Sequence, residues 1–138
     1  MTVVVDASVW VSRLVPQDVH HLASRRWLEQ VIADGRLLVA PILLLGEVAG
    51  AISRRTGEPE HAHRAVESLL RIPGLRLVSV DPQLGRAAAR LAADLRLRGS
   101  DAVYVAVAHQ LGLPLVTWDL EQRERARPVI VAHTPEQV

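Results

Sequence analysis

Short apolar runs alternate with longer helix-like segments along the whole chain of 138 residues. Each run is rich in Val, Leu or Ile and is bounded by turn-forming or helix-capping residues, a pattern that predicts a buried strand. Strands that alternate with helices are typical of a mostly parallel sheet covered by helices on both faces. The five predicted strands lie at residues 2–6, 36–40, 75–80, 114–119 and 128–133.

Helices are predicted between these strands, and most of them end at Gly or Pro. The segment 103–107, VYVAV, also fits a strand by propensity. A helix is favoured there because Ser100 is a good N-cap, the segment is rich in Ala, and Gly112 and Pro114 form a stop. The first predicted helix ends at Leu14, and the others cover about 18–33, 41–57, 58–72, 81–98, 100–112 and 120–126.

The chain contains no repeat, no low-complexity segment and no linker that would divide it. We therefore predict one α/β domain over residues 1–138, in which residues 134–138 form a frayed tail. No apolar run approaches the roughly 20 residues that span a bilayer, so no membrane association is expected.

The composition excludes several kinds of active site. Cysteine is absent, which excludes a thiol nucleophile and a Cys-based zinc site and suits the reducing cytoplasm, where we expect the protein. All 16 basic residues are Arg. The absence of Lys excludes a Walker P-loop and Schiff-base catalysis. The net charge is only +1, so bulk electrostatics point to no partner.

Four acidic residues differ from the rest, which lie among polar neighbours and are predicted to be solvated or capping. Asp6 and Asp119 each end an apolar strand, at the sheet edge where open α/β folds bind ligands. Glu47 lies in the apolar segment LLLGEVAGAI, where an unpartnered charge is costly to bury. Asp101 lies in the first turn of its predicted helix, where the helix dipole alone would favour a carboxylate.

Taken together, the four acids predict a divalent-metal site. Carboxylates that lie close together repel one another, and a cation removes that cost. Oxygen ligands without Cys or His favour Mg²⁺ or Mn²⁺ over zinc, as one ion or as two. The implied reaction is phosphodiester hydrolysis by a metal-activated water. If Asp6 is a metal ligand, capping of the first helix is expected to fall to Ser8 or to the backbone before Asp6.

Several polar residues near the acids have two interpretations that the sequence leaves open. Ser8, Ser100 and Thr117 lie within two residues of an acid and could orient a carboxylate, contact a phosphate or cap a helix. The histidines, including the adjacent His20 and His21, are predicted to be solvated.

The four acidic segments resemble those of PIN-domain ribonucleases. The segments are VVVDASVW, LLLGEVAGAI, GSDAVYVAVA and PLVTWD, and together they span residues 3–119. The chain length and the DAVYVAVA and TWD segments are most similar to VapC-type toxins of type II toxin–antitoxin pairs. Each segment is weak alone, but four in this order at these spacings form a fairly specific pattern.

The resemblance implies a metal-dependent endoribonuclease with a parallel sheet of order 3-2-1-4-5. Asp6, Asp101 and Asp119 would hold Mg²⁺ or Mn²⁺, and Glu47 would help to position or activate the water. Thr117 matches a small hydroxyl residue often found two positions before the last acid. The resemblance also implies a homodimer and a cognate VapB-type antitoxin whose tail occupies the active-site groove.

Contacts to the RNA backbone would have to come from arginines at the rim of the site. The predicted ones, for each of which a solvated surface role is the alternative, are Arg13, Arg54, Arg55, Arg98 and Arg123.

Three other functions are alternatives to this one. A phosphoacceptor receiver domain also gathers acids at strand ends, but it normally needs a Lys, which is absent. A catalytically degenerate PIN-like module that acts only by binding a partner or RNA is the second alternative. A DNA nuclease with the same metal chemistry is the third.

Overall fold

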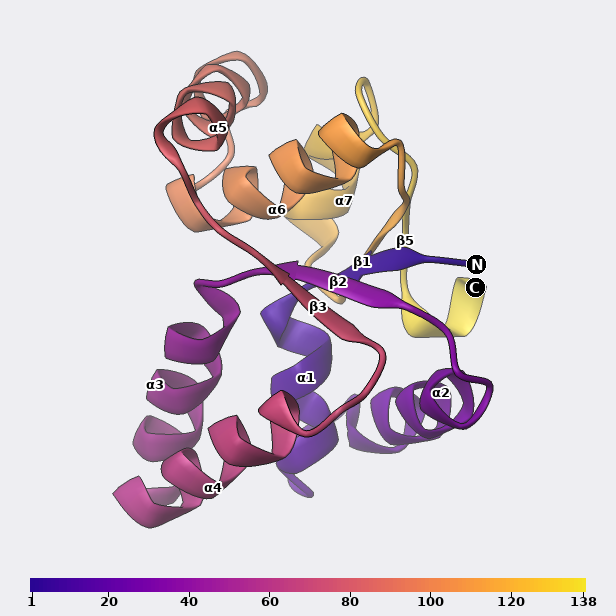
Figure 1. Ribbon diagram of the computed structural model, residues 1–138, viewed down its shortest axis with the longest axis vertical. Coiled ribbons are helices and arrows are strands. Elements are labelled where there is room, and N and C mark those ends of the chain that lie inside the picture. The colour runs from indigo at the N-terminus through magenta and orange to yellow at the C-terminus, as the bar shows by residue number, and fades with distance from the viewer.

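Five parallel strands form one sheet in the order β3-β2-β1-β4-β5, which confirms the predicted fold class and strand order. The computed structural model describes all 138 residues. Helices α1 to α4 lie on one side of the sheet and α5 to α7 on the other (Figure 1). The elements, in chain order, are β1 Val3–Val5, α1 Ala7–Leu14, α2 His21–Ala33, β2 Leu38–Pro41, α3 Leu44–Thr56, α4 Pro59–Leu70, β3 Leu75–Val78, α5 Pro82–Leu95, α6 Gly99–Leu111, β4 Leu115–Val116, α7 Leu120–Ala126, β5 Ala132–His133 and the 3₁₀ helix η1 Pro135–Gln137.

The central strand β1 forms the middle of the core because both of its faces are covered. Val3, Val4 and Val5 are fully buried, and β1 pairs with β2 on one side and β4 on the other. Burying a Val side chain contributes roughly 1.5 kcal/mol or more, so this short strand is a strong anchor. Asp6 follows directly, and its position is therefore determined by the best-packed strand of the sheet.

Helix α6 resolves the ambiguity of the VYVAV segment in favour of a helix, as predicted. Its residues from Tyr104 to Ala108 are all buried, on every side of the helix. A helix that is covered all round shows no amphipathic period, and this explains why the sequence pattern alone was equivocal. The helix begins at Gly99 with Arg98 as N-cap, so the prediction that Ser100 caps it was wrong.

Helix α2 begins at His21 instead of about residue 18. Asp18 accepts a hydrogen bond from the backbone N–H of His20 (2.8 Å), which closes a turn before the helix. Asx turns of this kind compete with helix formation and delay its start. Helix α5 ends at Leu95 instead of about residue 98. Arg96 takes a left-handed conformation with φ of 57°, which ends the helix there.

The C-terminal segment is ordered against α2, and the prediction of a frayed tail over residues 134–138 was wrong. Pro135 is buried, and η1 packs on α2 near the N-terminus of the chain (Figure 1). A capping box joins Thr134 and Gln137, whose side-chain oxygen accepts from the Thr134 N–H (2.9 Å). This local closure supplies the hydrogen bonds that a free tail would lack.

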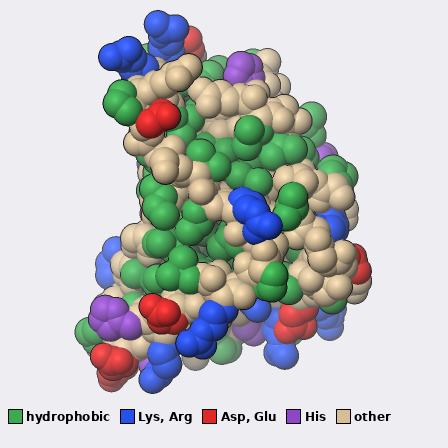
Figure 2. All heavy atoms as spheres, in the orientation of Figure 1, with side chains coloured by type: hydrophobic (Ala, Val, Ile, Leu, Met, Phe, Trp, Pro, Cys, Tyr) green, Lys and Arg blue, Asp and Glu red, His purple; other side chains and the backbone are tan.

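Charged and hydrophobic side chains separate on the face shown in Figure 2. Hydrophobic groups gather in the middle, around one basic side chain, and most charged groups lie at the periphery, chiefly at the two ends. The left margin is hollowed between α5 and the α3–α4 pair, on the side toward which the strands run (Figures 1 and 2). None of the helices combines the length with the apolar character that a membrane span requires.

Candidate active site

Asp6 lies directly after β1, where the residue is only 6% exposed. Its Oδ2 accepts hydrogen bonds from the Ser8 N–H (3.1 Å) and the Thr117 hydroxyl (3.0 Å). Asp6 is therefore the N-cap of α1, and the expectation that Ser8 or the preceding backbone would cap it was wrong. Burial raises the pKa of Asp6, its hydrogen bonds to Ser8 and Thr117 oppose this, and the nearby Asp119 raises it further.

Thr117 connects the two strand-end acids. Its fully buried hydroxyl donates to Asp6, accepts from the Asp119 N–H (3.1 Å) and shares a hydrogen bond with the Ser8 hydroxyl (3.3 Å). The Ser8 oxygen also accepts from the Trp118 N–H (3.1 Å). Both hydroxyls are therefore engaged within the protein, where they hold Asp6 and the segment that leads to Asp119.

Glu47 and Tyr104 form a pair that the sequence did not reveal. The fully buried Tyr104 hydroxyl donates to Glu47 Oε1 at 2.7 Å. Burial raises the pKa of Glu47, and the negative charges of Asp6 and Asp101 raise it further. The hydrogen bond from Tyr104 acts in the opposite direction. Tyr104 is the only tyrosine in the chain and stands three positions after Asp101. Residues three positions apart share one face of a helix, so this spacing was the one sign in the sequence that Tyr104 lies near the acids.

Asp101 is half-buried in the first turn of α6. Burial raises its pKa from 3.8 to about 6, with further contributions from Asp6 and Asp119, while Arg98 opposes the shift. No hydrogen bond engages its carboxylate, and Gln122 bonds only its backbone oxygen (3.3 Å). The Asp101 carboxylate is thus partly desolvated and has no hydrogen-bond partner within the protein.

The four predicted acids influence one another electrostatically, although they come from four different parts of the chain. Asp6 and Asp119 both raise the pKa of Asp101, and Asp6 and Asp101 both raise that of Glu47. No three Asp, Glu or His side chains converge on a ready-made coordination site. Asp119 accepts from the Gln122 N–H (3.1 Å), so it caps α7 as Asp6 caps α1.

The donor set nevertheless fits a hard divalent cation. The three ion pairs of the protein involve other acids, so no arginine forms a salt bridge with any member of this cluster. Clustered carboxylates without a cation repel one another, and their burial adds to the cost. Mg²⁺ commonly uses one or two protein carboxylates and keeps several waters, so it does not need three converging side chains.

A groove of about 590 Å³ opens between α1 and α3, and Glu47 is the one member of the four acids that lines it. Ser8 also lines it, and so do Arg54, Arg55 and Arg98. The groove therefore contains three of the five arginines predicted to contact RNA. Arg55 also forms an ion pair with Asp18 (2.7 Å), and its groove-side charge is partly balanced there.

The other predicted polar residues lie outside this groove. Arg123 donates to the Thr117 backbone oxygen (2.9 Å), which supports the segment before Asp119. Arg13 is half-buried, and burial lowers its pKa. Ser100 is exposed, and its hydroxyl forms no hydrogen bond within the protein.

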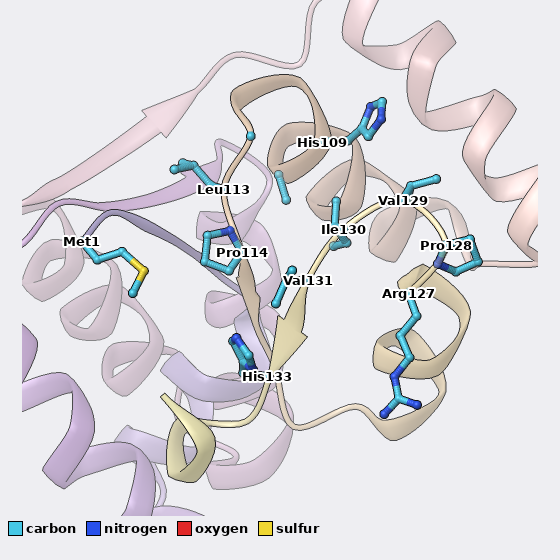
Figure 3. A pocket seen from close by; sticks show the side chains of 12 residues that line it. Met1, His109, Leu113, Pro114, Arg127, Pro128, Val129, Ile130, Val131 and His133 are labelled. Carbon is cyan, nitrogen blue, oxygen red and sulfur yellow. The ribbon is translucent and has the colours of Figure 1, made fainter.

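A second hollow, of about 600 Å³, lies at the opposite edge of the sheet, where β4 and β5 begin (Figure 3). None of the predicted site residues lines it, and neither does any acid. Its polar side chains His109, Arg127 and His133 point in different directions (Figure 3). This hollow therefore lacks converging groups that could carry the chemistry predicted for the acids.

The raised pKa values predict that the metal-free protein loses stability as the pH increases. The folded protein holds protons on Asp6, Glu47 and Asp101 more tightly than the unfolded chain does. These groups thus favour folding below about pH 4, and the benefit is lost as the pH rises through about 6, the pKa of Asp101. The melting temperature in EDTA, measured between pH 4.5 and 7.5, should fall as the pH rises. Addition of Mn²⁺ at pH 7.5 should raise it again. A melting temperature that rises over that interval without metal would contradict the prediction.

Comparisons with known proteins place the chain in a family. The sequence model of the PIN domain matches residues 3–128, so the chain belongs to the PIN domain family. No curated protein sequence matches it significantly.

Similar solved structures include three at low sequence identity. The VapC20 toxin of Mycobacterium tuberculosis has a TM-score of 0.73 at 21% identity, over 87% of this chain and 92% of that one. The DNA-bound VapBC of Salmonella typhimurium has a TM-score of 0.73 at 18% sequence identity, and the match covers 98% of each chain. PAE2754 of Pyrobaculum aerophilum has a TM-score of 0.69 at 23% sequence identity, and the match covers 96% of this chain and 89% of that one. At these identities the likeness shows a shared fold.

Proposed function

We propose that this protein is a Mg²⁺- or Mn²⁺-dependent endoribonuclease that hydrolyses RNA phosphodiesters. The observation that carries the proposal is the cluster of Asp6, Glu47, Asp101 and Asp119, which are electrostatically coupled and lack a cationic partner in a salt bridge. Membership of the PIN domain family removes the receiver-domain alternative. The adjacent arginine-lined groove supports a polyanionic substrate.

Each acid has a distinct part in this proposal. Asp6, Asp101 and Asp119 would hold the ion, which when bound lowers the pKa of water and neutralises charge that develops on the phosphate. Glu47 has Oε1 occupied by the Tyr104 hydroxyl, which leaves Oε2 to accept a proton from the attacking water. Burial raises the pKa of Glu47, which makes its carboxylate a better proton acceptor than an ordinary Glu.

The biological role that we propose is the toxin of a toxin–antitoxin pair. The similar VapC20 is described as a toxin that cleaves the sarcin–ricin loop, and other similar structures are toxin–antitoxin complexes. By analogy, we propose a cognate VapB-type antitoxin that covers the groove and a homodimeric toxin. Arg54 and Arg98, which are exposed and form no ion pair, are the residues that we expect to contact the RNA backbone.

RNA cleavage by the purified protein tests the proposal directly. We expect cleavage of structured RNA with Mg²⁺ or Mn²⁺, none in EDTA, and recovery when Mn²⁺ is added back. A calorimetric titration with Mn²⁺ should show binding in the same buffer. A protein that binds no Mn²⁺ at millimolar concentration and cleaves no RNA would support the catalytically degenerate module instead. Cleavage of DNA but not RNA would favour the DNA nuclease.

A further inference from the structure

Asp119 stands on a segment that the sheet does not hold. Strand β4 consists of Leu115 and Val116 alone, and the last ladder bond runs from the Thr117 N–H to the His133 oxygen (2.9 Å). The sequence predicted a strand that would extend to Asp119 itself. Asp119 itself donates from its N–H to the Thr117 hydroxyl (3.1 Å) and accepts from the Gln122 N–H (3.1 Å), both bonds to residues within three positions. Since the backbone is free of the ladder at Trp118 and Asp119, the placement of this segment on the rest of the fold depends on contacts of Trp118.

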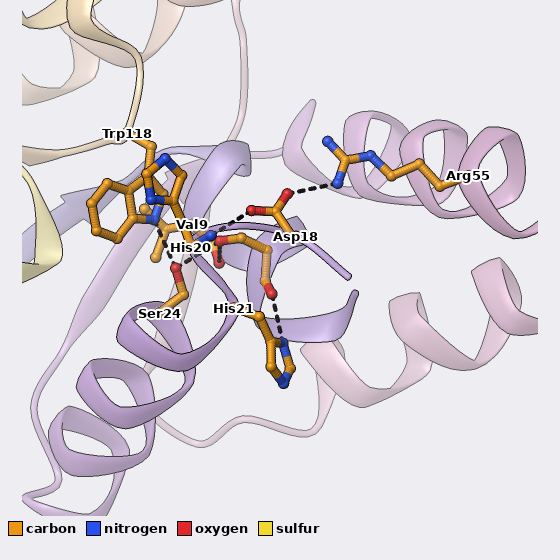
Figure 4. Close-up of polar contacts among 8 residues, drawn as sticks. Val9, Asp18, His20, His21, Ser24, Arg55 and Trp118 are labelled. Atoms are coloured by element: carbon orange, nitrogen blue, oxygen red, sulfur yellow. Dashed lines mark hydrogen bonds and ion pairs between the residues drawn. The ribbon is translucent and has the colours of Figure 1, made fainter. Parts of the chain in front are cut away.

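Trp118, immediately before Asp119, is held by three separate contacts, of which Figure 4 shows those to His20 and Ser24. Its ring stacks on the His20 imidazole with centroids 3.9 Å apart and planes 4° from parallel. Its indole N–H donates to the Ser24 hydroxyl (2.7 Å), and its backbone N–H donates to the Ser8 hydroxyl (3.1 Å). We name these four residues, Ser8, His20, Ser24 and Trp118, the Trp118 clamp.

The partners of Trp118 are themselves held in place. Asp18 accepts from the His20 N–H (2.8 Å) and pairs with Arg55 (2.7 Å), which orders the turn that carries His20 (Figure 4). The buried Ser24 hydroxyl bonds to the Ser12 hydroxyl (2.6 Å). The Ser12 hydroxyl in turn donates to the Val9 oxygen (3.0 Å). The corner between α1 and α2 is thus a rigid support for the Trp118 ring.

We propose that the Trp118 clamp positions Asp119 for metal binding and catalysis, an inference that rests on the proposed function. A ring fixed on one face by His20 and at its N–H by Ser24 restricts the backbone torsions of Trp118. Because Asp119 is the next residue, this restriction limits where its carboxylate can lie. Groups that orient metal ligands commonly alter metal affinity or activity by about 10-fold to 100-fold when removed.

Two His20 variants distinguish positioning from a general structural role. We expect His20→Ala to weaken Mn²⁺ binding about tenfold in calorimetric titrations and to lower kcat on RNA by a similar factor, with KM for RNA unchanged. His20→Phe keeps a flat ring that can stack on Trp118 and should restore both quantities. His63→Ala, which removes an exposed imidazole on α4, is the matched control and should match the wild type.

Three outcomes would overturn the inference. The first is a His20→Ala protein with wild-type Mn²⁺ affinity. The second is a higher KM alone, which would mean that His20 contacts RNA. The third is loss of Mn²⁺ affinity in His20→Ala without rescue in His20→Phe, which would remove stacking as the cause. A wild-type protein that binds Mn²⁺ but cleaves no RNA would contradict the nuclease proposal, while the comparison of Mn²⁺ affinities would still decide the role of the clamp.

Discussion

An Asp101→Asn protein is expected to cleave RNA about a thousandfold more slowly than the wild type and yet to unfold at a higher temperature without metal. Asn has nearly the same shape but no charge, so it would bind a divalent ion weakly. Metal stabilisation of a phosphoryl transition state is worth several kcal/mol, which corresponds to about a thousandfold in rate.

The opposite effect on stability follows from the environment of Asp101. Its pKa is raised to about 6 by burial and by Asp6 and Asp119, so the ionised form is unfavourable in the folded metal-free protein at pH 7.5. The full shift would correspond to about 3 kcal/mol, but the carboxylate is half exposed and solvent screens it. Loss of a favourable helix-dipole interaction offsets part of the gain. We expect a net gain of about 0.5 to 1 kcal/mol, or about 3 °C.

Thermal unfolding in EDTA at pH 7.5 and at pH 4 measures the stability effect. The gain should disappear at pH 4, where Asp101 is protonated in the folded wild type. Asp94→Asn removes the charge of an exposed acid on α5 and should change neither activity nor stability appreciably. Near-normal cleavage by folded Asp101→Asn protein would disprove the site assignment.

Thr117→Val is expected to lower both the stability and the activity of the protein, because one buried hydroxyl serves two of the acids. Val fills the same space but cannot donate to Asp6 Oδ2 or accept from the Asp119 N–H. A buried group left without its partner costs about 1 to 3 kcal/mol, so we expect a loss of about 2 kcal/mol. The release of Asp6 and Asp119 should also lower kcat by about 10-fold to 100-fold.

The Thr117→Ser variant distinguishes the effect of losing the hydroxyl from the effect of losing the methyl group. It keeps all three hydrogen bonds and loses one methyl, which costs about 0.8 kcal/mol, so its activity should stay close to that of the wild type. Thr2→Val, at a site without a side-chain hydrogen bond in the protein, is the control for the substitution itself. Denaturant unfolding and kcat at saturating Mn²⁺ are the two measurements. Equal activity of the Val and Ser variants would show that the Thr117 hydroxyl does not orient the acids.

Local sequence pattern was sufficient where the structure depends on burial and chain order. The run of three Val before Asp6 predicted the central strand because both faces of a parallel strand are covered. The predicted boundaries were least accurate where side chains override the pattern. Asp18 delays α2 by binding the His20 N–H, and the capping box at Thr134 orders a segment that was predicted to fray.

The histidines show most clearly what a sequence cannot reveal. His20 was predicted to be solvated, but its ring lies on Trp118, which is 98 positions away in the chain (118 − 20). Tyr104 likewise meets Glu47 across 57 positions. Neither pair has a periodic signal, because a single contact between distant segments leaves no pattern in either one.

The sequence by itself determined the class of fold, the strand order through its family resemblance, and the four acids whose placement in apolar surroundings required an explanation. The tertiary structure alone decided how those acids are held. Asp6 and Asp119 both cap helices, Thr117 bridges them, Tyr104 engages Glu47, and the stack of His20 on Trp118 supports the segment before Asp119. The physical reason is that burial and strand formation depend on local apolar pattern, whereas hydrogen bonds and stacking across the fold depend on where distant segments meet.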